Sequence, residues 1–158
     1  MSREETYEAT KRVYALYAAF FGAVAREVGV ERALALHARA HEEQGLASGE
    51  LLKQKIGERP EIEMLGSVLR ASNLSIGIDC QLGTADSSSA IFRNSQCPMY
   101  DGYRMGGLDE ETAEALCQRG AAAKLGTMLQ QLDPRIAYRL KHYRARPDET
   151  CEEEIGYL

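Results

Sequence analysis

The spacing of apolar residues changes along this chain, and the change requires a fold that contains both helices and strands. Between residues 3 and 28 the large apolar side chains recur with a period of about 3.6, as on one side of a helix. They are Tyr7, Tyr14, Tyr17, Phe21, Val24 and Val28. From about residue 67 the period falls towards two, which is typical of strands. The sequence therefore predicts long helices first and a sheet after them.

A second long helix is predicted directly after the first. Gly29 ends the first helix, and the second starts near Glu31 and continues across two glycines towards Ile56. Gly57 and Pro60 then break the chain, because neither residue favours the interior of a helix. The first 60 residues of the chain therefore predict two helices joined by a short turn.

The alternation typical of strands appears in the later segments. Residues 67–79 and 88–96 predict a first antiparallel pair, and residues 136–158 predict a terminal hairpin. A helix with Asp109 as its N-cap separates the two pairs. The sequence thus predicts a single α+β domain over residues 1–158. Its N-terminal helices are expected to pack on one face of a four-stranded antiparallel sheet, with a helix between the two strand pairs.

Composition argues against several functional classes. The formal net charge of −5 argues against a nucleic-acid-binding surface, which needs an excess of Lys and Arg. The longest apolar run, Val13 to Ala25, has 13 residues, whereas about 20 are needed to cross a bilayer. Acidic residues precede this run, where a secretory signal would be basic. We therefore expect a cytoplasmic protein with no nucleic-acid or membrane partner, and homo-oligomerisation is left open.

The stretch CPMYDGY, residues 97–103, gathers the side chains best suited to chemistry. Pro98 and the nearby glycines predict a loop, and reactive side chains on loops commonly face a cleft. Cys97 is therefore the candidate nucleophile, with His142 as its candidate general base. The alternative is that Cys97 is a small buried thiol at the end of a strand.

Aromatic and basic residues around this stretch form a candidate pocket. Tyr100 and Tyr103 are its expected wall, and Arg93 and Arg104 could take a substrate carboxylate in a two-pronged contact. The alternative is that the arginines are solvated on the surface and that the tyrosines belong to the core or its rim. On the first interpretation the partner is a small-molecule substrate or ligand.

Thiols and imidazoles suggest a metal site. Cys97, Cys117 and Cys151 stand 20 and 34 residues apart, and they would converge on a zinc ion if the central helix packs over the sheet. His37 and His41 stand four residues apart on one helical face, within reach of a common metal ion. The alternatives are separate buried thiols and two histidines satisfied by hydrogen bonds. Zinc is thus the cofactor that the sequence suggests.

The chain from Cys97 onward resembles a known family. The segments CPMYDGYRMGG, LCQRG and LDPRIAYRLKHYRARPDETCEEEI resemble the L-2-amino-thiazoline-4-carboxylic acid hydrolase-like family. That pattern contains a Cys-Pro after a strand, a helical cysteine, an Asn/Asp-Pro and a cysteine in the last strand. The matching positions here are Cys97-Pro98, Cys117, Asp133-Pro134 and Cys151. A more distant likeness is to the 4-vinyl reductase domain, a small-molecule-binding module that can hold zinc through cysteines.

The first resemblance implies a hydrolase that opens a carbon–nitrogen bond in a small carboxylated heterocycle or amide. Either a Cys97 thiolate attacks the ring carbon with His142 as base, or a metal held by the cysteines or by the two helical histidines delivers hydroxide. The second resemblance implies a non-catalytic module that binds zinc and a small molecule. The hydrolase is the expected function, and the zinc-binding module is its alternative.

Overall fold

Helices and strands follow one another with short connections in the computed structural model, which describes residues 2–158. Their bounds in chain order are α1 (Arg3–Val28), α2 (Val30–Ile56), α3 (Ile62–Ser75), β1 (Asp79–Ala85), β2 (Ser89–Gln96), α4 (Pro98–Met105), α5 (Glu110–Leu132), β3 (Ile136–His142) and β4 (Cys151–Tyr157). The protein is therefore an α+β fold, as the sequence predicts.

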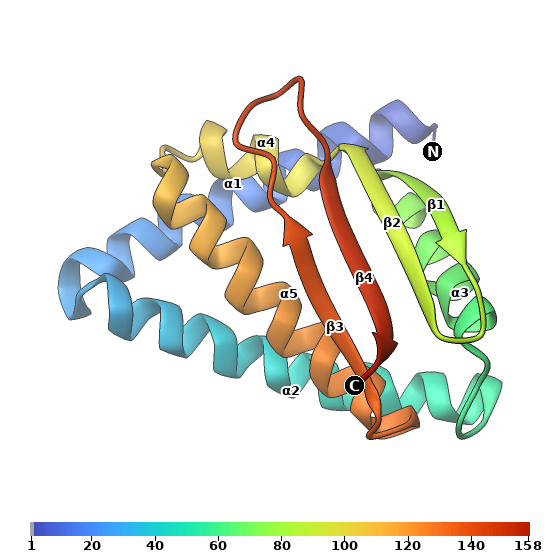
Figure 1. The fold of residues 1–158 in the computed structure, drawn as a ribbon. Helices are drawn as coiled ribbons and strands as arrows, with labels where there is room; N and C mark the ends of the chain where they lie inside the picture. Colours follow the sequence, from blue (N-terminus) through green and yellow to red (C-terminus); the bar gives the residue numbers. More distant parts are fainter. Residues whose placement is uncertain (1) are drawn as a thin grey trace.

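The strands form an antiparallel sheet in the order β1-β2-β4-β3. The terminal hairpin joins the first pair through β4, which lies between β2 and β3. Figure 1 shows the helices together on one side of this sheet, while the other side is uncovered. This arrangement confirms the expected layer of helices on one face of a four-stranded antiparallel sheet.

The register of the strands places a carboxyl group at the centre of the covered face. Phe92 of β2 and Leu140 of β3 both pair with Glu153 of β4, so the three side chains form one row across the sheet. The neighbouring row is buried and consists of Ala90, Ile155 and Tyr138. Because side chains alternate along a strand, Glu152 and Glu154 belong to the opposite, outer face.

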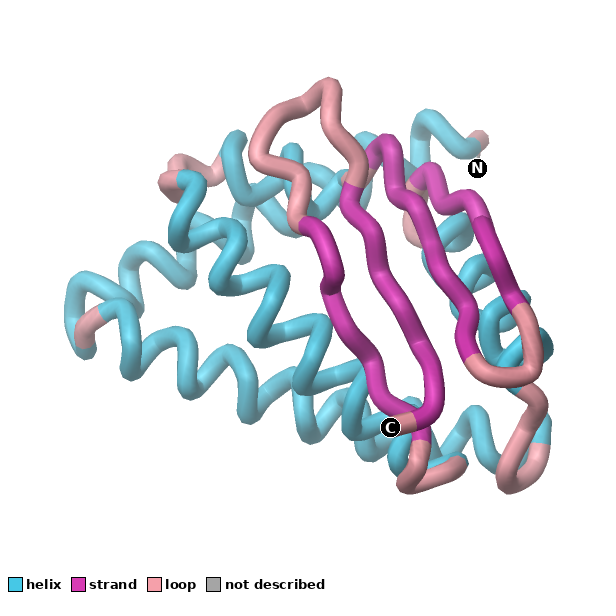
Figure 2. The backbone as a smooth tube through the Cα atoms, viewed as in Figure 1, coloured by secondary structure: helices cyan, strands magenta, loops and turns pink. Residues whose placement is uncertain are grey.

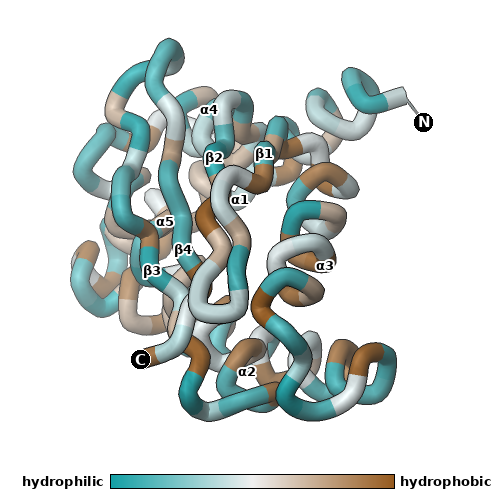
Figure 3. Tube along the Cα trace, turned by 45° about the vertical axis from the view of Figure 1, so that its right-hand side comes forward, coloured by the Kyte–Doolittle hydropathy of each residue, from teal (hydrophilic) through white to brown (hydrophobic). Residues whose placement is uncertain are grey.

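The outer face of the sheet carries several charged side chains beside the apolar Ile91. Arg93 Nε lies 3.3 Å from Glu152 Oε2, and Arg139 Nη1 lies 3.4 Å from Glu154 Oε2. In Figure 3 the two C-terminal strands are largely hydrophilic, whereas α3 alternates turn by turn between hydrophilic and hydrophobic residues. Exposed pairs of this kind contribute about 0–1 kcal/mol each, so their main effect is to keep this face hydrated.

Glycines let the helices approach one another closely. A Cβ atom at Gly45 of α2 would lie 2.5 Å from the Lys124 carbonyl oxygen of α5, and one at Gly106 would lie 2.5 Å from the Ala15 carbonyl oxygen of α1. Real side chains do not tolerate such distances. The two glycines inside the predicted second helix therefore do not weaken it, because they are the positions at which α5 packs against α2.

The strand predicted over residues 67–79 is wrong, because most of that segment belongs to helix α3. The buried residues of α3 follow a helical spacing: Ile62, Leu65, Gly66 and Leu69. The alternating apolar residues that suggested a strand lie at the C-terminal end of this helix and in the turn after it, where Gly77 has a φ of 90°. The first strand begins only at Asp79.

The loop predicted around Cys97 is also wrong, because Pro98–Met105 forms helix α4. Proline is well tolerated in the first turn of a helix, where its missing N–H would have no partner. Gly102 and Gly106 serve the contact between α4 and α1 rather than a turn. Cys97 is therefore the residue that caps a helix, and it does not lie on an open loop.

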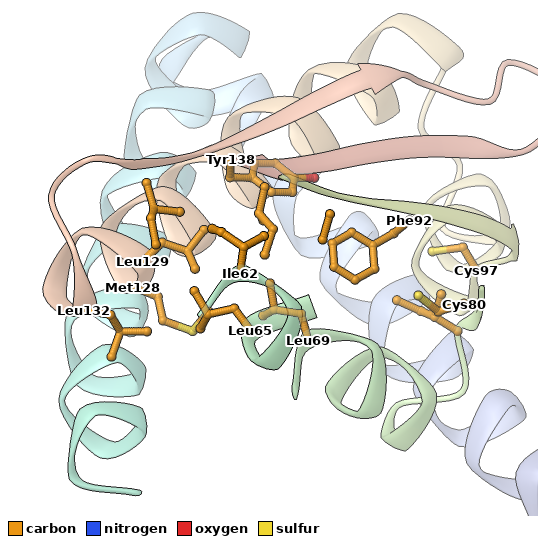
Figure 4. Close-up of a cluster of buried hydrophobic side chains, with 14 of the residues drawn as sticks. Ile62, Leu65, Leu69, Cys80, Phe92, Cys97, Met128, Leu129, Leu132 and Tyr138 are labelled. Carbon is orange, nitrogen blue, oxygen red and sulfur yellow. The ribbon is translucent and has the colours of Figure 1, made fainter. Parts of the chain in front are cut away.

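Two apolar clusters hold the layers together. The first, shown in part in Figure 4, lies between the sheet and helices α3 and α5 and includes Leu65, Phe92, Leu129 and Ile155. The second joins α1, α2, α4 and α5 and includes Phe21, Leu34, Tyr103 and Leu116. Within residues 2–158 no helix is both long enough and apolar enough to cross a membrane.

Candidate functional site

A cavity of about 140 Å³ lies between the covered face of the sheet and the helices. The sheet contributes Asn94, Tyr138, Leu140, Cys151 and Glu153 to its wall. Helix α5 contributes Leu116, Cys117, Ala121 and Leu125, and helix α2 contributes His41. An apolar cavity of about 150 Å³ can hold a molecule of the size of benzene, so this cavity suits a ligand about as large as one aromatic ring.

Two wider hollows lie at the surface, with volumes of about 400 and 600 Å³. One lies beside Arg70 and Gln81, and the other lies among Arg3, Glu8 and Asp101. Few residues line each hollow, and most of them are polar, so a ligand there would stay largely in contact with water. Binding sites for small molecules usually enclose the ligand among apolar side chains, which makes the interior cavity the candidate site.

Polar side chains of three strands meet at the sheet wall of this cavity. Asn94 Nδ2 donates a hydrogen bond of 3.0 Å to Glu153 Oε1. Glu153 keeps some accessible surface through the cavity that it lines, although protein atoms surround its carboxyl group. Burial raises the pKa of Glu153 to about 7, partly offset by its hydrogen-bonding neighbours. Near neutral pH this carboxyl group is therefore divided between its protonated and ionised forms.

Three polar atoms of the cavity residues have no hydrogen-bond partner among residues 2–158. They are Asn94 Oδ1, the Tyr138 hydroxyl and the Tyr143 hydroxyl. All three side chains are more than nine-tenths buried, with relative exposures of 2%, 9% and 8%. In Figure 4 the Tyr138 ring lies beneath the strands, with its hydroxyl directed away from Leu129 and towards the side where Phe92 lies. A buried polar group without a partner destabilises a fold, so this wall is unusual for a core.

The structure brings the three predicted zinc ligands Cys97, Cys117 and Cys151 to the same cavity. Burial, however, disfavours the charged thiolate, which is the nucleophilic and metal-binding form. Burial raises the pKa of Cys97 to about 12, and it also raises the pKa of Cys117 and of Cys151. Cys97 therefore fits the alternative interpretation from the sequence, a small buried thiol at the end of a strand.

The zinc site is not formed. Within the described part of the chain, no group of three or more His, Cys, Asp or Glu side chains is arranged so that it could hold a metal ion. The thiols border a cavity rather than a common point, and zinc as a cofactor stays a prediction.

The two helical histidines make hydrogen bonds instead of a metal site. His37 Nδ1 lies 2.5 Å from the Tyr17 hydroxyl, and His37 Nε2 lies 3.0 Å from the Leu116 carbonyl oxygen. Because a carbonyl only accepts, Nε2 carries the proton and Nδ1 accepts from the tyrosine. His41 Nδ1 donates to the His37 carbonyl oxygen at 3.0 Å. Burial, with a smaller effect of His41, lowers the pKa of His37 to about 4, so this side chain is neutral.

The predicted general base and one predicted substrate-binding residue lie away from the cavity. His142 is exposed at the end of β3 and does not line the cavity that Cys97 lines. Arg93 points to the outer face of the sheet, where its partner is Glu152. The structure therefore does not bring Cys97 and His142 together as a catalytic pair.

The other three residues predicted to bind substrate have different positions. Tyr100 is 1% exposed and lines the cavity, and its hydroxyl donates a hydrogen bond of 3.2 Å to the Ala145 carbonyl oxygen. Tyr103 is buried in the helical cluster, with its ring centroid 5.6 Å from that of Tyr14. Arg104 is partly exposed, and its guanidinium lies 5.7 Å from the centroid of the Tyr100 ring.

Arg144 is a buried residue that the sequence analysis missed. It lies at the start of the long loop between β3 and β4, which extends beyond the end of the sheet in Figure 2. Its guanidinium lies 4.7 Å from the centroid of the Tyr100 ring, and it donates to the carbonyl oxygens of Ser95, Arg146 and Pro147. Arg144 therefore fastens this loop over the end of the cavity at which Tyr100 and Tyr143 lie. Its sequence context, between two other arginines, carries no signal for burial.

The fold is that of a protein with a known structure. The chain is similar to trafficking protein particle complex subunit 3 from Naegleria fowleri, whose solved structure is covalently bound to palmitic acid. The two share 12% sequence identity and superpose with a TM-score of 0.55, over 92% of this chain and 95% of that one. No protein-family model and no curated protein matches the sequence. At this identity the likeness shows the fold alone.

The hydrolase function expected from the sequence is wrong, and so is its zinc-binding alternative. A solved structure with this fold is a trafficking protein particle complex subunit, a different kind of protein from the expected hydrolase or zinc module. The cavity thiols are protonated, and no group of metal ligands forms among residues 2–158. The resemblance to the hydrolase-like family stays a prediction, because no family model matches the chain.

Proposed function

We propose that this chain is a non-enzymatic subunit that acts by assembling with other protein chains, beginning with a second copy of itself. The fold supports the proposal, because a subunit of a multi-protein complex shares it along nearly its whole length. The observation that carries the proposal is an exposed apolar stripe on helix α1.

The stripe consists of Val13, Leu16 and Phe20, whose exposed fractions are 65%, 74% and 65%. These residues are spaced by three and four positions, so they lie on one side of α1. Ala18 and Phe21, on the other side of the helix, are buried against the rest of the molecule. Apolar side chains gathered on one helical face commonly mark a protein contact.

Two copies of the stripe can cover each other if the helices pack in antiparallel fashion. Acidic residues mark the N-terminal turn of α1, and Arg26 lies in its last turn, so an antiparallel pair places opposite charges near each other. Burying six such side chains is worth roughly 9–18 kcal/mol, which exceeds the association cost of roughly 4–15 kcal/mol by a modest amount. We therefore expect a dimer that dissociates on dilution.

The test is the mass of the protein in solution, measured by light scattering after size-exclusion chromatography. Wild-type protein at high concentration should have twice the chain mass of 17.5 kDa. The double variant Leu16→Glu/Phe20→Glu should have the mass of a single chain, because it places charges at the centre of the interface. Circular dichroism should show that its helix content is unchanged.

The matched control is Leu51→Glu, which adds a charge at an apolar residue of α2 that is 59% exposed and lies outside the stripe. This variant should remain a dimer. A wild-type protein that is a monomer at every concentration, or a double variant that stays dimeric, would contradict the proposal. A cytoplasmic location belongs to the same proposal and stays a prediction.

A further inference from the structure

The interior cavity is built to meet a ligand that donates hydrogen bonds. Its sheet wall presents Asn94 Oδ1 without a partner beside the Glu153 carboxyl group, which accepts a 3.0 Å hydrogen bond from Asn94 at Oε1 and has the Tyr138 hydroxyl as a second hydrogen-bonding neighbour. Within residues 2–158, no lysine, arginine or histidine forms an ion pair with Glu153. The wall therefore offers the Asn94 oxygen, which the protein itself does not use, next to a carboxyl group whose two oxygens can accept further hydrogen bonds.

The geometry points to a compact primary amine with an apolar body as the ligand of this cavity, its nitrogen donating to Glu153 and Asn94 Oδ1. An amine is favoured over an alcohol because a hydroxyl group has a single hydrogen to donate, whereas a protonated amine has three. The third can go to the hydroxyl oxygen of Tyr138, whose own hydrogen stays directed at Glu153. This inference concerns the interior cavity, which is separate from the α1 stripe.

The size and lining of the cavity define the rest of the ligand. A volume of about 140 Å³ matches a single ring or a short branched chain, rather than a long acyl chain. The remaining walls provide apolar contacts from Leu116, Ala121, Leu125 and Leu140. The basic groups among the helical residues of the wall are Lys124 and His41, and Cys117 and Tyr14 are further titratable side chains there. They lie on the helical side of the cavity, away from the carboxyl group on the sheet.

The central position of Glu153 makes the polar wall hard to explain as packing. It lies in the row between Phe92 and Leu140, in the middle of the covered face of the sheet. A carboxyl group there must be desolvated, and an apolar residue of similar size would avoid that cost. A ligand that completes the hydrogen bonds of Glu153, Asn94 and Tyr138 gives all three side chains a common role.

The experiment is isothermal titration calorimetry of wild-type protein with a matched set of probes. Benzylamine, benzyl alcohol and benzoate have the same ring with an amine, a hydroxyl or a carboxylate, and palmitate serves as a long-chain probe. Benzylamine should bind at least tenfold more tightly than benzyl alcohol, and benzoate should not bind detectably. Because this comparison uses wild-type protein only, it does not depend on whether a variant folds.

Two variants then test whether the amine of the ligand contacts Glu153. Glu153→Gln should weaken benzylamine binding at least tenfold and leave the weaker binding of benzyl alcohol within a factor of about three. Glu152→Gln is the matched control, since it removes the neighbouring carboxylate on the outer face and should change nothing. Any of three results would overturn the inference: no binding of benzylamine, binding of benzoate or palmitate in its place, or equal benzylamine affinity in wild type and Glu153→Gln.

Discussion

Glu153 shows how one residue can carry both a stability cost and a function. Its carboxyl group lies in the middle of a sheet face that otherwise packs mainly apolar side chains, and its pKa rises to about 7 because ionisation there is unfavourable. In an unfolded chain the same group has its ordinary pKa of 4.5. Between these two values the folded state binds a proton that the unfolded state does not, so folding becomes less favourable as the pH rises.

The first prediction at the residue scale follows from this difference. At pH 8 the variant Glu153→Gln should be more stable than wild type by on the order of 3 kcal/mol, because it buries a neutral amide instead of a carboxylate. At pH 4.5 the two should differ much less, since the wild-type carboxyl group is then protonated in the fold. Urea unfolding at both pH values measures the difference. Glu152→Gln should show no such gain at pH 8, and an equal gain in the two variants would contradict the argument.

Helices α2 and α5 owe their close contact to glycine, and this contact can be tested at the scale of the element. A methyl group at Gly45 would lie 2.5 Å from the Lys124 carbonyl oxygen, a backbone atom that cannot turn aside. Gly45→Ala should therefore destabilise the protein by about 1–3 kcal/mol, although alanine favours a helix. Thermal or urea unfolding provides the measurement.

Gly126 of α5 is the matched control for this prediction. No atom lies within 4 Å of a Cβ built there, so Gly126→Ala should gain up to about 1 kcal/mol from helix propensity alone. The idea that Gly45 is needed for packing would fail if both substitutions stabilised the protein to the same extent.

The same glycines show how far the sequence predicts the elements. Helices α1 and α2 and the terminal hairpin follow from periodicity, whereas α5 follows from its N-cap Asp109. Helix α4 was not predicted, because Pro98 and Gly102 favour loops: Pro98 fits in its first turn, and Gly102 is needed for the contact with α1. The strand expected over residues 67–79 failed because apolar residues at the end of α3 alternate by chance.

Part of the candidate site was also predicted from the sequence. Cys97, Tyr100, Cys117, Cys151 and His41 do reach one cavity, since they lie on elements that face the core. Their chemistry was wrong because burial, which keeps the thiols protonated, cannot be read from residue types. Asn94 and Tyr143 were missed, since single polar residues in strands and loops are usually solvated. Arg93 and His142 were predicted to lie at the site, but Arg93 is on the outer face of the sheet and His142 is exposed at the end of β3. The sequence does not show the strand register that decides these positions.

At the scale of the whole molecule, two buried groups change its stability with pH in opposite directions. His37 links α1, α2 and α5, and its pKa falls to about 4 from an ordinary 6.5. The unfolded chain therefore binds a proton at His37 between these values that the folded protein does not, and stability falls as the pH drops from 6.5 to 4. His41 acts in the same direction, because burial lowers its pKa as well. Glu153 acts against both over most of this range.

The balance predicts a stability maximum near pH 6.5. From pH 4.5 to 6.5 the loss from Glu153 offsets much of the gain from the histidines, and above pH 6.5 the loss from Glu153 alone continues until about pH 7. In Glu153→Gln only the histidines remain, so stability should rise steeply to pH 6.5 and then stay level. Urea unfolding at fixed protein concentration between pH 4.5 and 8 compares the two curves. If the wild-type curve has the same shape as that of Glu153→Gln, then the carboxyl group at the centre of the sheet is not held protonated by the fold.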